Sequence, residues 1–130
     1  MATLKRFEDL DVWKKARVMV NTIYSTTSNN GFSKDWMLAN HLRKTAVSII
    51  SKIAEGFERD GNKEFINFLS IAKGSCGELR CQLYIAYDQH YINENQFKEI
   101  SNLAAEISRS LKGLILYLQN SDFKGIKNKI

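Results

Sequence analysis

The sequence predicts an all-α protein folded as an antiparallel, up-down-up-down four-helix bundle. Three observations predict this class. Apolar residues recur at spacings of three and four along four segments, which places them on one face of a helix in each. Proline, which interrupts helix interiors, is absent from all 130 residues. The links between the segments are short, and short links make consecutive helices antiparallel neighbours. The length predicts a single domain over residues 1–130.

The first helix is expected over about residues 7–27. Asp9 and Asp11 would lie in its first turn, where acidic side chains favour the helix dipole. The sequence Ser-Asn-Asn-Gly at residues 28–31 is a stop signal. The apolar face of this helix consists of Val12, Trp13, Ala16, Met19, Val20 and Ile23.

The second helix is expected over about residues 34–57, with Ser33 as its N-cap. It carries two apolar ladders displaced by roughly 100°. The first ladder is Leu38, Leu42, Ala46, Ile49, Ile53 and Gly56. The second ladder is Val47, Ile50, Ala54 and Phe57. Because so wide an apolar arc needs more than one neighbour, the second ladder contacts either another helix of the bundle or another subunit.

The third helix is expected over about residues 63–89. Its seam is formed by Phe65, Leu69, Ala72, Cys76, Leu79, Leu83 and Ala86. Its other side is a strip of small residues, Ser70, Gly74, Gly77 and Cys81. Glycine inside a helix costs about 1 kcal/mol relative to alanine. We therefore predict a close helix contact or an oligomer interface at Gly74, Gly77 and Cys81. The same prediction covers Val47, Ile50 and Ala54 of the second ladder.

The fourth helix is expected over about residues 94–120. Asn93 and Gln96 resemble a capping box at its start. Its seam has the most regular spacing in the chain and consists of Phe97, Ile100, Ala104, Ile107, Leu111, Leu114 and Leu118. A basic tail follows at residues 121–130.

The net charge of +5 is unevenly distributed. Residues 14–52 hold seven basic residues and one acidic residue, whereas residues 53–120 hold seven basic and nine acidic residues. This asymmetry favours a polyanionic partner. The candidate phosphate contacts are Lys14, Lys15, Arg17, Arg43, Lys44 and Lys52. The alternative is an ordinary solvated surface. Aromatic stacking platforms are not evident, because Trp13 fits the core face.

Two carboxylates stand off the main apolar seams. Glu55 has Arg59 one turn later, an ordinary helical ion pair. We expect Glu55 and Glu78 to form structural ion pairs or hydrogen bonds. The alternative is that they line an oligomer pore or a ligand pocket.

Catalytic and metal chemistry is not predicted. His41 and His90 fall on different helices, and neither has a metal-binding partner three or four residues away. No Glu-x-x-His motif and no glycine-rich phosphate loop occurs. The sequence spacing also places no histidine beside a serine where it could act as a base. Cys76 and Cys81 are five residues apart in one helix and cannot pair. We therefore expect a protein that is not an enzyme, with no metal and no cofactor.

The cellular setting follows from what the sequence lacks. It has no secretory signal at its N-terminus and no run of eighteen apolar residues. Its two cysteines do not suggest a disulfide scaffold. A cytoplasmic location and no membrane partner are therefore expected.

Several stretches together carry a family resemblance from residue 7 to about residue 118. They are Leu10–Ala16, His41–Ile49, Ile53–Phe57, Lys63–Phe65 and Leu69–Leu79. With them the chain resembles the bacterial four-helix-bundle family of proteins encoded by 23S rRNA intervening sequences. The family pattern reads Ser-Ile-Pro-Ser-Asn-Ile-Ala-Glu-Gly. Here Ile50 stands for the proline and Lys52 for the asparagine, so a straighter and more basic helix is expected.

The resemblance implies a small, ring-like homo-oligomer such as a pentamer. It also implies kinship with the accessory proteins of diversity-generating retroelements, which are basic bundle oligomers that engage nucleic acid and a reverse transcriptase. The expected partners are therefore copies of the chain itself, RNA or DNA, and a reverse transcriptase or a ribosomal nucleoprotein. The alternative is a protein-protein interaction scaffold with no nucleic-acid role, in which charge serves only solubility.

Overall fold

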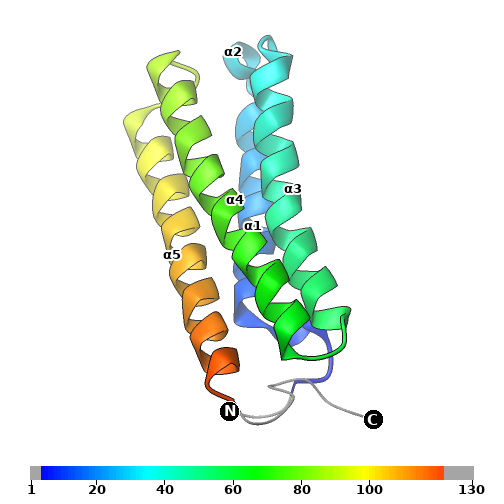
Figure 1. Cartoon of the computed structure of the whole chain (residues 1–130). Coiled ribbons are helices and arrows are strands. Elements are labelled where there is room, and N and C mark those ends of the chain that lie inside the picture. The colour runs from blue at the N-terminus through cyan, green and yellow to red at the C-terminus, as the bar shows by residue number, and fades with distance from the viewer. Residues whose placement is uncertain (1–3, 122–130) are drawn as a thin grey trace.

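The structure, a computed structural model, describes residues 4–121 and is all-helical over that range. Four long helices alternate in direction (Figure 1), and they are α1 (Asp11–Thr27), α3 (Trp36–Glu58), α4 (Asn62–Asp88) and α5 (Glu94–Gln119). A 3₁₀ turn, η1 (Phe7–Asp9), precedes α1, and a single helical turn, α2 (Asn30–Ser33), separates α1 from α3. The predicted all-α helical bundle is confirmed. The expected basic tail lies outside the described residues except for Ser121.

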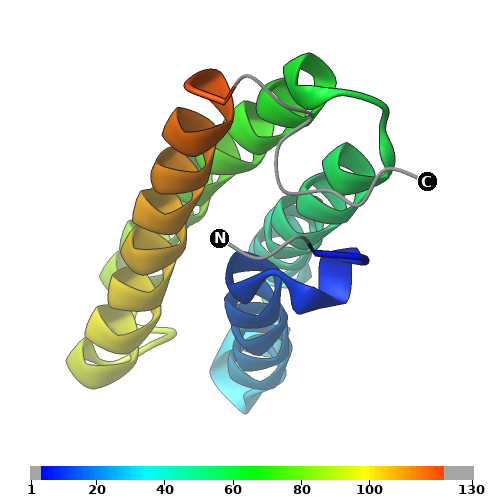
Figure 2. The same cartoon turned by 90° about the horizontal axis from the view of Figure 1, so that it is seen from below.

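The helices pack in a ring in which α3 contacts α1 and α4, and α5 contacts α4 and α1. Seen along the bundle, α1 and α3 form one side and α4 and α5 the other (Figure 2). One core runs through the middle, and its largest fully buried side chains include Phe65, Met19, Leu42, Ile53 and Ile107. The seams predicted from spacing thus face the interior.

The helix starts differ from the sequence expectations in two places. The first long helix begins at Asp11 rather than near Phe7, because extended backbone at Leu10 separates it from η1 and buries the Leu10 side chain. Ser33 does not cap the second long helix but lies in α2. Asp35 is the N-cap, and its side chain accepts a hydrogen bond of 3.1 Å from the Leu38 amide. The predicted capping box of Asn93 and Gln96 is confirmed.

The close helix approach lies at a different glycine from the predicted pair. A Cβ on Gly56 would lie 2.7 Å from the Cβ of Phe68 on α4. Nothing of the described chain lies within 4 Å of a Cβ built on Gly74 or Gly77. Within residues 4–121 the expected close contact at Gly74 and Gly77 is therefore absent, because α4 turns this strip away from its buried seam.

Candidate nucleic-acid interface

Positive charge collects on the α1 and α3 side of the bundle. In α1 three basic residues stand against one acidic residue, and the first nineteen residues of α3 hold three basic residues and no acidic one. In contrast, α4 and α5 each hold three basic and three acidic residues. The two helices that carry the cations predicted from sequence, α1 and α3, pack side by side.

A shallow depression of about 620 Å³ follows the outer face of α3. Tyr24 of α1 forms one edge. The α3 residues that line it are Asn40, Arg43, Lys44, Val47, Ser48, Ser51 and Lys52. Its lining contains three cations and no carboxylate, a combination suited to an anionic ligand. Hereafter it is called the α3 depression.

Arg43 contacts the end of α1 through two hydrogen bonds. Its Nε donates to Thr27 Oγ1 at 2.8 Å, and its Nη2 donates to Ser28 Oγ at 3.1 Å. The guanidinium also lies 4.8 Å from the centroid of the Tyr24 ring. A cation at a helix C-terminus is favoured by the helix dipole. Arg43 therefore joins α3 to α1, and its hydroxyl partners leave its charge unneutralised.

The two lysines of the α3 depression differ in their surroundings. Lys44 is exposed, and it pairs with no carboxylate of the described residues. Lys52 lies 3.5 Å from Glu55 through its Nζ and 5.5 Å from the centroid of the Phe68 ring. Lys44 is thus the more available of the two for a phosphate.

The three cations of α1 are spread around that helix. Lys15 reaches α5, where its Nζ lies 3.3 Å from Ser110 Oγ and 3.4 Å from Glu106 Oε2. Tyr24 follows nine residues later, and about 100° per residue places it on the opposite side of α1. Arg17, exposed beside the Trp13 ring, is seven residues before Tyr24 and shares its side. Lys14 is exposed to solvent. The structure therefore brings Arg43, Lys44 and Lys52 together, aligns Arg17 with them, and separates Lys15.

Two exposed aromatic residues beside these cations were missed from the sequence. Trp36, the first residue of α3, is 69% exposed, and Tyr24 is 43% exposed. A sequence signal existed for Trp36, since it belongs to neither apolar ladder of its helix. Aromatic stacking platforms are therefore available next to the basic side.

Glu55 lies at the C-terminal end of the α3 depression in a small cluster of its own. It pairs with Arg59 at 3.1 Å and with Lys52 at 3.5 Å, and both cations lie over the Phe68 ring. The hydrogen bond from Arg59 and the charge of Lys52 lower the pKa of the Glu55 carboxyl. Glu78 is exposed on α4 and pairs with no cation of the described residues.

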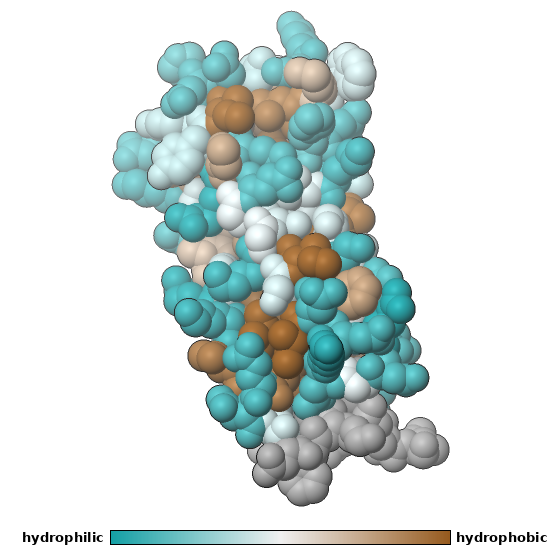
Figure 3. Space-filling view, viewed as in Figure 1, coloured by the Kyte–Doolittle hydropathy of each residue, from teal (hydrophilic) through white to brown (hydrophobic). Residues whose placement is uncertain are grey.

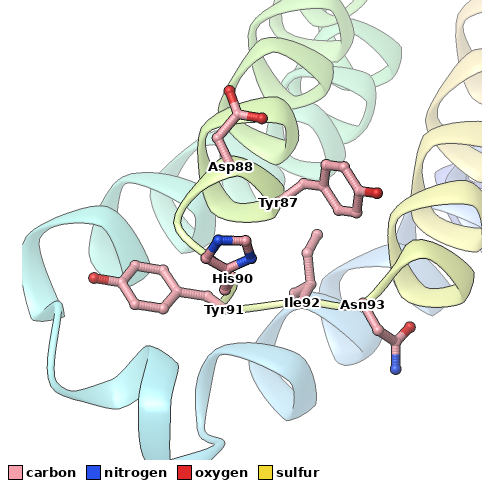
Figure 4. A pocket seen from close by; sticks show the side chains of 6 residues that line it. All are labelled: Tyr87, Asp88, His90, Tyr91, Ile92 and Asn93. Carbon is pink, nitrogen blue, oxygen red and sulfur yellow. The ribbon is translucent and has the colours of Figure 1, made fainter.

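A second depression, whose lining includes His90, lies at the turn between α4 and α5. It has a volume of about 470 Å³ and is lined by Tyr87, Asp88, His90, Tyr91, Ile92 and Asn93. Its side chains point in different directions (Figure 4). Tyr91 turns away and donates through its hydroxyl to Asp35 at 3.1 Å, which raises the pKa of Tyr91. The lining therefore offers no converging set of polar groups.

Metal-ligating and nucleophilic side chains are scattered. Within residues 4–121, no three His, Cys, Asp or Glu side chains stand close enough to hold a metal ion. Burial raises the pKa of the Cys76 thiol to about 11, and Cys81 is exposed. None of the helices in this range combines the length and apolar character needed to span a bilayer.

Comparisons with known proteins give a family and a fold. A family model described as 23S rRNA-intervening sequence protein matches residues 8–113. A crystal structure of a protein of unknown function, from the S23 ribosomal protein family of Bacteroides thetaiotaomicron, is 24% identical with a TM-score of 0.75. The alignment covers 81% of this chain and 95% of that chain, and at this identity it shows the fold alone. No curated protein matches the sequence.

Proposed function

The chain belongs to the 23S rRNA-intervening sequence protein family, and from that premise we propose that it is a non-enzymatic, homo-oligomeric bundle that binds RNA, DNA or a nucleoprotein through the basic side of α1 and α3. The observation that carries this proposal is the α3 depression, whose lining includes Arg43, Lys44 and Lys52 without any carboxylate. Phosphate groups are the anions that such a cation row recognises along a chain. Under the same proposal the nucleoprotein is ribosomal or contains a reverse transcriptase.

Self-association is proposed through the outer face of α4. Ile50 packs against the core, Ala54 is half-buried, and Val47 lines the α3 depression, so these three serve the bundle or the basic side. The remaining candidates, Gly74, Gly77 and Cys81, are exposed on α4. Ile71 and Ile85 on the same helix are 44% and 45% exposed, which adds apolar area to the strip.

Assembly would strengthen nucleic-acid binding. Five copies of a chain with net charge +5 would carry about +25. Each phosphate neutralised releases counterions, so affinity would fall steeply with salt. An α4 contact between copies would leave the α3 depression open on each of them.

The experiment compares two double variants with equal net charge. Lys14→Glu with Lys44→Glu changes exposed cations of the basic side, whereas Arg80→Glu with Lys112→Glu changes exposed cations of α4 and α5. Each double variant lowers the net charge from +5 to +1. Binding of labelled RNA and DNA is followed by fluorescence anisotropy at about 50 and 200 mM salt, where electrostatic binding differs strongly.

We expect the basic-side variant to lose at least about tenfold in affinity, or about 1.4 kcal/mol, and the control to lose much less. Equal losses in the two variants would refute a localised interface. If the unaltered protein binds neither RNA nor DNA at low salt, the nucleic-acid proposal fails.

The second candidate function is a protein-protein interaction scaffold without a nucleic-acid role. The exposed apolar residues of α4 and α5 favour it, among them Ile71, Ile85 and Leu116. Figure 3 shows apolar surface in the lower half of the face where α4 and α5 run. A partner protein that stays bound after nuclease treatment, and that also binds the Lys14→Glu/Lys44→Glu variant, would favour this function.

A further inference from the structure

Trp36 is the most exposed of the large hydrophobic side chains in the described residues. It is 69% exposed, and its neighbour Met37 is 61% exposed. Tryptophan gains much from burial, and exposed tryptophan is enriched where proteins bind their partners. The exposed indole of Trp36 is therefore suited to bind a ligand with an apolar face.

Trp36 lies on the same face of α3 as two of the three cations of the α3 depression, Arg43 and Lys44. Asn40, Arg43 and Val47 follow it by four, seven and eleven residues, which places all of them within about 40° of Trp36 around the helix. Lys44 lies about 80° away on the outward side. From Trp36 to Lys44 the helix rises about 12 Å at 1.5 Å per residue, whereas Lys52, sixteen residues after Trp36, lies about 160° around the helix and outside this face. Trp36, Arg43 and Lys44 thus form one continuous track.

Tyr24 extends this track across to α1. The Arg43 guanidinium covers one face of its ring at 4.8 Å, while 43% of the residue stays exposed. An aromatic ring backed by a cation presents a second flat surface beside the row of positive charge. A nucleotide strand offers the matching chemistry, a flat base on each phosphate-bearing unit.

We infer that the track on α3 binds a single strand of nucleic acid, with Trp36 stacking on an unpaired base and Arg43 and Lys44 contacting its phosphates. This inference rests on the proposed function and names the form of nucleic acid. In a duplex the base faces are already covered by their neighbours, so Trp36 would have no surface to stack on. Stacking on aromatic side chains beside a basic groove is how single strands are held without base-specific hydrogen bonds.

The test uses the intrinsic fluorescence of Trp36. The chain has two tryptophans, so the Trp13→Phe variant leaves Trp36 as its only one. This variant is titrated at about 50 mM salt, where electrostatic binding is strong, with a twelve-nucleotide single strand, as RNA and as DNA, and with the matching duplex. We expect each single strand to quench the emission of Trp36 at saturation and the duplex to leave it unchanged.

Substitutions then separate stacking from charge. Trp36→Ala should weaken single-strand binding by about tenfold and leave duplex binding unchanged, and Trp36→Phe should restore most of the loss. Tyr117→Ala, at an exposed aromatic residue of α5, is the matched control and should have no effect. Because Trp36 is largely exposed, the alanine variant is expected to fold, which circular dichroism checks.

The outcomes distinguish this inference from the function on which it rests. Equal quenching by duplex, or unchanged single-strand binding by Trp36→Ala, overturns single-strand stacking while basic-side binding of nucleic acid stands. No binding of any strand by the unaltered protein overturns both. In the absence of nucleic acid, the fluorescence of Trp36 could be blue-shifted and protected from quenching by iodide. That result would show that a second copy of the chain covers the indole, and it would also overturn the inference.

Discussion

Gly56 of α3 lies directly against Phe68 of α4, so closely that a Cβ on the glycine would stand 2.7 Å from the Cβ of the phenylalanine. The same Cβ would be 3.2 Å from the Phe65 ring and 3.4 Å from its carbonyl oxygen. The glycine at this point therefore sets how near α3 and α4 can pack. The Glu55-Gly56 pair in the last turn of α3 is therefore a packing device, in which Glu55 also holds Lys52 and Arg59 over Phe68.

Gly56→Ala is expected to destabilise the fold by up to about 2 kcal/mol. Overpacking a well-packed core costs about 1–3 kcal/mol, and the gain in helix propensity of about 1 kcal/mol offsets only part of it. Gly74→Ala, in open space, is the matched control and should be stabilising by about 1 kcal/mol. Urea unfolding measures both, and equal stability of the two variants would contradict the close approach.

Arg43→Ala should lower the free energy of unfolding by about 1–3 kcal/mol, because it removes two hydrogen bonds and leaves the Thr27 and Ser28 hydroxyls without that donor. Lys44→Ala should stay within about 0.5 kcal/mol, as expected for an exposed surface residue. Thermal unfolding of the two variants tests this difference. If both are neutral, the contact between α3 and the end of α1 contributes nothing to stability.

Glu55→Gln should lower stability at pH 7, and the difference from the unaltered protein should shrink as the pH falls below 4.5 and through the folded pKa of Glu55. The pKa of this carboxyl is lowered by Arg59 and Lys52, so its stabilising effect is present above its unfolded value of 4.5 and is lost as pH falls through its folded pKa. Glu78→Gln, at an exposed carboxylate, is the control. Denaturant midpoints across this range check the prediction, which is contradicted if both variants respond alike.

The two cysteines should differ sharply in reactivity. In the Cys81→Ser variant, the remaining Cys76 thiol should react with a disulfide reagent at pH 8 only after unfolding, because burial raises its pKa to about 11. In Cys76→Ser, Cys81 should react within the mixing time. Because the pKa of Cys76 is raised, its neutral form stabilises the fold fully below its unfolded value of 9.0, and this stabilisation is lost as pH rises through about 11. Rapid labelling of folded Cys76 would show that α4 opens locally.

His90→Gly should stabilise the fold by about 0.5–1 kcal/mol. His90 has a φ of 64°, and the flanking amides make the hydrogen bonds of a Schellman cap, Tyr91 to Ala86 and His90 to Tyr87. Glycine adopts this conformation without a Cβ penalty. Gln89→Gly, where φ is −84°, should be neutral or destabilising. Thermal unfolding of both variants provides the comparison.

The helical seams could be read from sequence because spacing alone decides which residues share a face. Spacing could not tell which glycine meets a neighbouring helix, so Gly74 and Gly77 were preferred over Gly56. The N-cap of α3 was predicted at Ser33, and the structure places it at Asp35. The choice depends on long-range contacts, since Phe32 is buried and Asp35 also accepts the hydroxyl of Tyr91, which comes 56 residues later.

The candidate site was predictable only in part. Charge counting along the chain placed the cations on two helices, and those helices are neighbours. It could not separate Lys15, whose partners Glu106 and Ser110 belong to α5, from the cations of the α3 depression. The signal for Trp36, its place outside both apolar ladders of its helix, was overlooked, and packing then shows that the side chain turns outward.

The uneven charge of the bundle gives it an electric dipole perpendicular to its long axis. The α1 and α3 side is positive, and the α4 and α5 side is near neutral. A polyanion approaching from any direction would exert a torque on such a molecule before any contact forms. The bundle would rotate to present α3 first, so that collisions become productive more often than chance allows. Orientation would then be set at long range by the charges, and only the final few ångströms would depend on Arg43, Tyr24 and Trp36.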